Sequence, residues 1–248
     1  MELNYPSKSN GMYILSRYQI DDIATMILLE YMPSVLENAR PVDIEALVED
    51  HLYLMIQNQA LGFGSSILGI TAFEDVEDLP CLDDMYQPIK IGLPAGTILI
   101  HSCLLGYQNK ARRRYTIAHE CSHWILHRTY YSPVNQQYKL RTQRLPYVAC
   151  RSANIERKQH DLISDSDWEE WQADTLAAAL LMPLAPFKLF ANRLICKGRR
   201  QYLPEKVTSE YIEIVEEIAD KFTVSKQAAE IRLKHLGMIK KERSFSYL

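Results

Sequence analysis

Two histidines and a glutamate stand close together at residues 119–123, in the sequence His-Glu-Cys-Ser-His. If this stretch is helical, His119 and His123 lie one turn apart on the same face, where both imidazoles can bind one metal ion. Glu120 lies beside the first histidine, where its carboxylate can take a proton from a water molecule held by the metal. The pattern His-Glu-x-x-His therefore predicts a zinc site with Glu120 as its catalytic base.

The surrounding sequence favours the helix that this geometry needs. No proline or glycine interrupts residues 110–131, and apolar residues recur at helical spacing through the motif. A short motif of this kind also arises by chance, in which case the helix would simply carry two hydrogen-bonded histidines. A zinc site needs at least one further protein ligand, so the rest of the sequence must supply it.

Two positions close to the motif are poor sources of that ligand. One class of zinc proteases carries a third histidine six residues after the second, but this chain has Thr129 there, which excludes that class. His127 lies one further turn along the helix, and three successive turns of a straight helix do not converge on one tetrahedral ion. We therefore expect His127 to be a structural, hydrogen-bonded residue.

A second helix, predicted over residues 167–182 and ended by Pro183, is a better source. It contains strong helix formers and has acidic residues in its first turn, where the helix dipole favours them. Glu170 and Asp174 are four residues apart and share a face. Glu170 would bind the metal, and Asp174 would hold the far nitrogen of a ligating histidine. Glu169, one position round the helix, is the competing candidate for the ligand.

The two helices together resemble the ImmA/IrrE family of metallopeptidases over about residues 110–185. The resemblance rests on Tyr-Thr-Ile-Ala-His-Glu at 115–120, on His123 and His127, and on Glu-x-x-Ala-Asp at 170–174 followed by Leu-Leu-Met-Pro at 180–183. There are two departures. Cys121 and Ser122 stand where the family commonly has Leu-Gly, and the connection between the two helices is long.

The resemblance implies a gluzincin-like zinc peptidase in which His119, His123 and Glu170 bind one Zn²⁺ ion per chain. It implies an α+β fold, mostly helical and zincin-like, with a small antiparallel or mixed sheet. It also implies a regulatory endopeptidase that cleaves a DNA-binding repressor at a specific site. Such cleavage would control transcription of a mobile element or a stress response.

The composition is that of an ordinary soluble globular protein, with 47% hydrophobic and 24% charged residues among 248. The net charge of −3 gives no overall bias towards nucleic acid. Neither a signal peptide nor a membrane-spanning run is apparent, so we expect a cytoplasmic protein without a membrane partner. The five scattered cysteines suit a reducing compartment. We expect Cys150 to be a buried free thiol rather than a cap on the metal, and the role of Cys121 stays open.

Short apolar runs broken by glycine and proline predict a small sheet between residues 52 and 100, with strands at 66–73, 89–93 and 97–101. We expect Ile98-Leu99-Ile100 to lie nearest the metal helix, as an edge strand to which a peptide substrate could add. The acidic residues between 74 and 84 are interpreted as a solvated loop. Residues 129–166, rich in tyrosine and arginine, should form the rim of the cleft and supply an oxyanion donor that the sequence does not single out.

The chain should begin loosely over residues 1–11 and continue with helices at 19–36 and 41–49, the latter begun by Pro41 or capped by Asp43. We assign residues 1–196 to the peptidase domain and 197–248 to a C-terminal helical segment.

The C-terminal segment resembles a helix-turn-helix, with Ser225 capping its second helix. Lys226, Arg232 and Lys234 would suit DNA phosphates, but the first helix is acidic. We therefore favour packing or substrate docking over direct nucleic-acid binding. The alternative function is a DNA-binding transcription regulator with a structural or vestigial zinc site.

Overall fold

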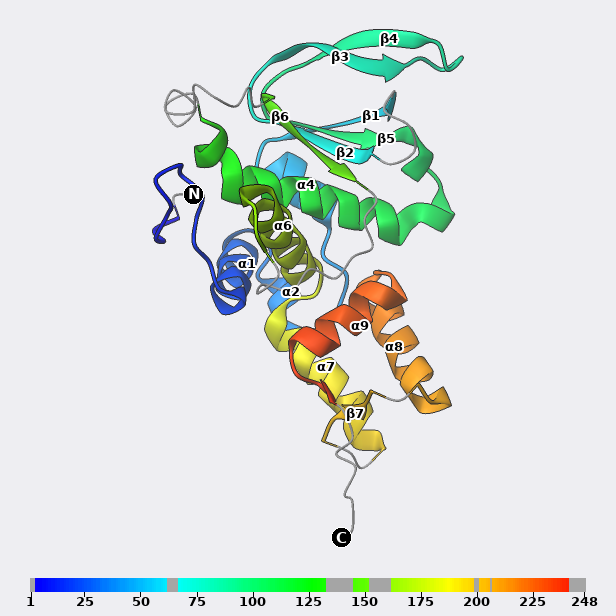
Figure 1. Cartoon of the computed structure of the whole chain (residues 1–248). Coiled ribbons are helices and arrows are strands. Elements are labelled where there is room, and N and C mark those ends of the chain that lie inside the picture. Colours follow the sequence, from blue (N-terminus) through cyan, green and yellow to red (C-terminus); the bar gives the residue numbers. More distant parts are fainter. Residues whose placement is uncertain are drawn as a thin grey trace.

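The computed structural model is α+β and describes residues 3–61, 67–132, 145–151, 162–198, 201–205 and 207–240. The long helix α4 (Lys110–Tyr131) crosses the middle of the molecule, with the main sheet on one side and the other long helices on the other (Figure 1). Both α6 (Asp165–Leu181) and strand β2 (Ile67–Ala72) contact α4 directly. The helix that carries the His-Glu-x-x-His motif is therefore enclosed from two sides.

The helical predictions are largely confirmed, with shifted ends. The other described helices are α1 (Arg17–Tyr31), α2 (Ser34–Glu37), α3 (Ile44–Ala46), α7 (Leu184–Lys197), α8 (Ser209–Phe222) and α9 (Lys226–His235). Shorter elements are the π-helix η1 (Leu47–His51) and the 3₁₀ helices η2 (Ser102–Leu104) and η3 (Tyr107–Asn109). The helix predicted over 19–36 is two helices, because Pro33 has no N–H to donate and interrupts the first. Asp43, not Pro41, begins α3, since its side chain accepts a hydrogen bond from the Ala46 N–H.

Among the described residues, the main sheet has six strands in the order β4-β3-β1-β5-β2-β6. They are β1 (Met55–Leu61), β2, β3 (Val76–Leu82), β4 (Pro88–Leu93), β5 (Thr97–His101) and β6 (Tyr147–Arg151). Within the described part of this sheet, β1 and β5 pair in parallel and the other neighbours are antiparallel. A separate two-stranded sheet pairs β7 (Leu203–Pro204) with β8 (Ile239–Lys240) in parallel. The three predicted strands are confirmed, whereas β1, β3 and β6 were not anticipated. Glu77 and Asp78, expected in a loop, lie exposed on β3.

The prediction that residues 98–100 form the sheet edge is wrong. On β5, Leu99 is paired with Gln57 of β1 on one side and with Ile70 of β2 on the other. The backbone of β5 is thus already engaged in two ladders. The edges of this sheet are β4 and β6, and β6 is the one that contacts α4.

One hydrophobic core joins the long helices, including the two at the C-terminal end. The ring of Phe222 on α8 lies 5.4 Å from that of Phe187 on α7. Ser225 caps α9 as predicted, by accepting from the Ala228 N–H. The assignment of residues 197–248 to a segment of their own stays a prediction. Among the described helices, none is by itself long and apolar enough to cross a membrane; only α6 and α7 together pass on length and composition, as a pair bent by 67°.

The prediction of a loose start over residues 1–11 is wrong for the part of this segment that the structure describes. Lys8 Nζ and Asn10 Nδ2 bind the two carboxylate oxygens of Asp165, the first residue of α6, at 2.9 and 2.8 Å. Farther along, the carbonyl oxygen of Tyr13 accepts a hydrogen bond from Gln172 on the same helix. The N-terminal segment therefore holds α6 at two places.

Candidate metal centre

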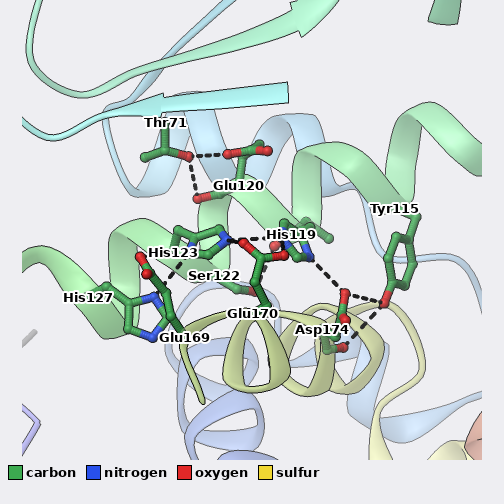
Figure 2. A network of polar contacts seen from close by, with 11 residues as sticks. Thr71, Tyr115, His119, Glu120, Ser122, His123, His127, Glu169, Glu170 and Asp174 are labelled. Atoms are coloured by element: carbon green, nitrogen blue, oxygen red, sulfur yellow. Dashed lines mark hydrogen bonds and ion pairs between the residues drawn. The ribbon is translucent and has the colours of Figure 1, made fainter. Parts of the chain in front are cut away.

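The polar side chains that face each other between α4 and α6 form one buried network (Figure 2). The helix α4 presents three histidines four residues apart: His119, His123 and His127. The helix α6 is begun by Ser164 and Asp167, which cap each other reciprocally. It contributes Glu169, Glu170, Gln172 and Asp174.

The first cluster, here called the outer triad, consists of His119, His123 and Glu170. Nε2 of His119 lies 2.9 Å from Nε2 of His123. The Glu170 carboxylate approaches these two nitrogens to 3.7 and 3.6 Å. One donor atom from each residue lies within 4.8 Å of the others. The histidine side chains are buried, whereas that of Glu170 is 17% exposed, so the cluster opens on the glutamate's side.

The donor set and its spacing fit a zinc ion. Two imidazole nitrogens and one carboxylate, with room for a fourth ligand, are the protein ligands of one class of catalytic zinc site. Two unprotonated ring nitrogens at 2.9 Å repel each other unless a cation or a proton stands between them. The separations around Glu170 are those of ligands placed about 2 Å from a shared ion. The residues present would therefore accommodate Zn²⁺.

Asp174 binds the other side of the first histidine. Its Oδ1 lies 2.9 Å from His119 Nδ1, so that nitrogen donates and Nε2 is left unprotonated. The hydroxyl of Tyr115, one turn earlier on α4, is 3.3 Å from the same oxygen. Asp174 is thus placed for the predicted task of holding a ligating histidine, and Tyr115 adds a contact that the sequence analysis did not assign.

Glu120 points from α4 towards the sheet and is completely buried. The Thr71 hydroxyl of β2 donates to Oε2 at 2.6 Å, while Oε1 has no hydrogen-bond partner among the described residues. Burial raises the pKa of this carboxyl to about 8; the nearby His119 and the Thr71 hydrogen bond lower it, and Glu170 and Glu169 raise it. A cation bound at the outer triad would favour the ionised form.

The place of Glu120 depends on a glycine in the neighbouring strand. A Cβ atom at Gly69 would stand 2.5 Å from Glu120 Oε1 and 2.8 Å from its Cγ. Gly69 and Thr71 alternate with Ile70 along β2 and so face α4 together. Sequence reasoning missed both, because nothing local in residues 67–72 indicates a contact with a helix 49 residues later.

A second cluster, here called the inner triad, consists of His123, His127 and Glu169. Nδ1 of His123 lies 3.1 Å from Nδ1 of His127 and 3.7 Å from Oε1 of Glu169. Glu169 and Glu170 therefore lie on opposite sides of the His123 ring. Tyr131 is hydrogen-bonded to Glu169, and burial is the main cause that raises the pKa of Tyr131.

The structure tests only part of the predictions about the cysteines and the rim of the cleft. Cys121 is buried in the apolar core, which raises the pKa of its thiol to about 12. Tyr130 and Tyr131 are buried at the end of α4. The side chain of Cys150, with most of the predicted rim (residues 133–144 and 152–161), lies outside the described residues.

Residues 145–234 match a peptidase family model described as the IrrE N-terminal-like domain. This match confirms the resemblance to the ImmA/IrrE family, which is metal-dependent, and supports peptide-bond hydrolysis as the general activity. The matched span contains Glu170 and Asp174 and runs through α9; it begins after α4, so the histidine motif adjoins it in space and not in sequence. No curated protein matches the chain.

Proposed function

We propose that the protein is a zinc-dependent endopeptidase whose single zinc ion is held by His119, His123 and Glu170. The observation that carries the proposal is the convergence of these three side chains from α4 and α6, with donor atoms within 4.8 Å of one another. Glu120, whose carboxylate is buried, directly follows His119 on α4.

When bound, zinc would polarise the scissile carbonyl and lower the pKa of the attacking water. Glu120 would accept the proton of that water and later pass it to the nitrogen of the leaving amine. Thr71 donates to Oε2, whereas Oε1 has no hydrogen-bond partner among the described residues and would be the oxygen that makes this transfer. Asp174 would keep His119 in the tautomer that binds metal.

An extended peptide substrate would bind along the sheet. Of the two edges of the main sheet, β6 contacts the motif helix, whereas β4 belongs to the far hairpin with β3 (Figure 1). We propose β6 as the edge beside which the substrate backbone aligns by strand addition. The target itself, a DNA-binding repressor of a mobile element or a stress response in the cytoplasm, is proposed from the family resemblance alone.

A transcription regulator that binds DNA through α8 and α9 is the alternative, and three basic residues of this segment make contacts within the fold. Arg232 is 1% exposed and binds the Asp21 carboxylate and the Met182 carbonyl oxygen. Lys226 pairs with Glu216. Lys234 pairs with Glu230 at 2.7 Å. These contacts favour a packing role for the helix pair, as expected from the acidic first helix.

The test compares the wild-type protein with Glu120→Gln, which keeps the size of the side chain but cannot accept the proton. Zinc is measured by elemental analysis. Cleavage of purified DNA-binding repressors from the organism that encodes this protein is followed by intact-mass spectrometry. We expect one zinc per chain in both proteins and fragments only with the wild type. Undiminished cleavage by the variant would overturn the mechanism, and absence of zinc after reconstitution would overturn the metal site.

A further inference from the structure

A chain of hydrogen bonds runs from the N-terminal segment to the second histidine of the motif, and its first member is Gln172. The Gln172 side chain is completely buried, and its Nε2 donates to the carbonyl oxygen of Tyr13 at 2.7 Å. This contact fixes the amide, because the flipped orientation would place two oxygens against each other. Gln172 Oε1 then faces His127 Nε2 at 3.0 Å and can only accept. His127 must therefore carry its proton on Nε2.

The next member of the chain is His123. With its proton on Nε2, a neutral His127 offers Nδ1 as an acceptor, and this atom lies 3.1 Å from Nδ1 of His123. His123 Nδ1 is then the donor. Oε1 of Glu169, at 3.7 Å, is too far away to replace His127 as its acceptor. The proton of His123 thus stays on Nδ1, and Nε2 is left unprotonated towards His119 and Glu170.

The two histidines of the motif are held in the same tautomer by different means. Asp174 accepts the Nδ1 proton of His119 directly. For His123 the acceptor is a third histidine, itself oriented by an amide. His127 suits this place because eight residues of helix advance about 12 Å and turn the side chain about 80° away from His119.

We propose that His127 and Gln172 are positioning residues, which keep His123 in the tautomer and ring orientation that metal binding requires. The inference rests on the proposed metal site. Nothing in the sequence distinguishes this role from that of an ordinary buried histidine. The direction of each hydrogen bond in the chain depends on the carbonyl oxygen of Tyr13, which lies 159 residues before Gln172.

The competing arrangement would place the metal in the inner triad, on Nδ1 of both His123 and His127 and on Glu169. The burial of these residues argues against it. Both histidines are completely buried and Glu169 is 4% exposed, so a metal there would be closed to water and substrate. The outer triad opens at Glu170.

The two arrangements differ in where the protons lie, and nitrogen-15 NMR of the histidine rings distinguishes them. In the zinc-loaded protein, the proposal places protons on Nδ1 of His123 and Nε2 of His127, on opposite nitrogens. A metal in the inner triad would leave both protons on Nε2. The metal-free protein provides a second reading, since His127 should already carry its proton on Nε2. A proton on Nδ1 of His127 in either form would overturn the proposal.

Zinc affinity, measured by competition with a chromophoric chelator, provides the second readout. His127→Leu should weaken zinc binding about 10- to 100-fold, the usual effect of losing the group behind a ligating histidine. His127→Asn, whose side-chain oxygen can occupy the place of Nδ1, should restore most of that loss. Gln172→Leu should also weaken zinc binding, because the proton of His127 would no longer be held on Nε2.

The outcomes separate this inference from the proposed function. Equal zinc affinity in the wild type, His127→Leu and His127→Asn would overturn the positioning role while leaving the metal site intact. Failure of the wild type to bind zinc would overturn the proposed function, and the tautomers of the metal-free protein would still test the hydrogen-bond chain. If His127→Leu does not fold, His127→Asn and Gln172→Leu provide the comparison.

Discussion

The carboxylate of Glu120 occupies the space that a side chain at Gly69 would need. A Cβ atom built there would meet Oε1 at 2.5 Å, Cγ at 2.8 Å and Cδ at 2.9 Å, all closer than real contacts allow. With alanine at position 69, either the Glu120 side chain or the strand would have to move. The position of the proposed base is thus determined by the sheet as much as by its own helix.

Gly69→Ala should displace Glu120 while leaving the three metal-facing residues in place. We expect about a 100-fold loss of cleavage, the scale of a misplacement of about 1 Å, with zinc content unchanged. Gly92→Ala is the matched control, because its Cβ would meet its nearest neighbour, the Val76 carbonyl oxygen, at 3.6 Å. Kinetics of repressor cleavage by the two variants provide the measurement. Equal cleavage activity in the two variants would show that catalysis does not depend on the contact between Gly69 and Glu120.

Glu170→Ala should lose most of its bound zinc, whereas Glu169→Ala should keep it. The reason is that Glu170 approaches Nε2 of both motif histidines, while Glu169 approaches Nδ1 of His123, on the side of the inner triad. Elemental analysis of both purified variants beside the wild type checks the prediction. The reverse result, with zinc lost only from Glu169→Ala, would move the metal to the inner triad.

Arg232→Met should lower the free energy of unfolding by about 3–5 kcal/mol, because it leaves the carboxylate of Asp21 buried without its cation. Replacing both partners, in Arg232→Met with Asp21→Leu, should cost less than the single change. Lys226→Met, which removes an exposed pair with Glu216, should cost no more than about 1 kcal/mol. Urea unfolding of the four proteins gives these values. A single variant as stable as the double would refute the argument.

His235 should make the protein less stable in acid. Burial, with help from Arg17, Arg232 and Lys234, lowers its pKa from 6.5 to about 3 in the folded state. Between those values the unfolded chain binds a proton that the folded chain does not, so stability falls as pH drops from 6.5 towards 3.

His235→Asn should therefore reduce the slope of the unfolding free energy against pH below 6.5. The reduction should correspond to at most one proton fewer taken up on unfolding. Urea unfolding at a series of pH values between 7 and 4 provides the measurement. Parallel curves for the variant and the wild type would mean that His235 titrates alike in both states.

Features encoded within one segment were predictable from the sequence. The helix over residues 110–131 has the expected bounds, because an unbroken stretch without proline or glycine leaves it no earlier stop. The strand at 97–101 is likewise confirmed, since β-branched apolar residues lie between turn-forming ones. The competition between Glu169 and Glu170 could be stated from helix geometry. The sequence favours Glu170, because it shares a face with Asp174 and matches the family segment Glu-x-x-Ala-Asp. The structure adds that the Glu170 carboxylate approaches Nε2 of both motif histidines.

Features that depend on long-range pairing were not predictable. The sequence of residues 97–101 does not tell whether the strand is central or at an edge, since a continuous apolar run suits a strand buried on both faces in either place. The contact of Gly69 and Thr71 with Glu120, and that of Tyr13 with Gln172, connect segments 49 and 159 residues apart. No local pattern encodes them.

The N-terminal segment before α1 has a practical consequence for anyone who shortens this chain. Its polar, turn-rich residues invite removal, yet Lys8 and Asn10 hold the first turn of α6 and Tyr13 orients Gln172. Trimming to the start of α1 would remove no metal-facing residue, although it would also remove the buried side chains of Met12 and Leu15. It would nevertheless take away the outer supports of α6, so such a truncated protein would fold around a loosened metal centre and give a misleadingly weak enzyme.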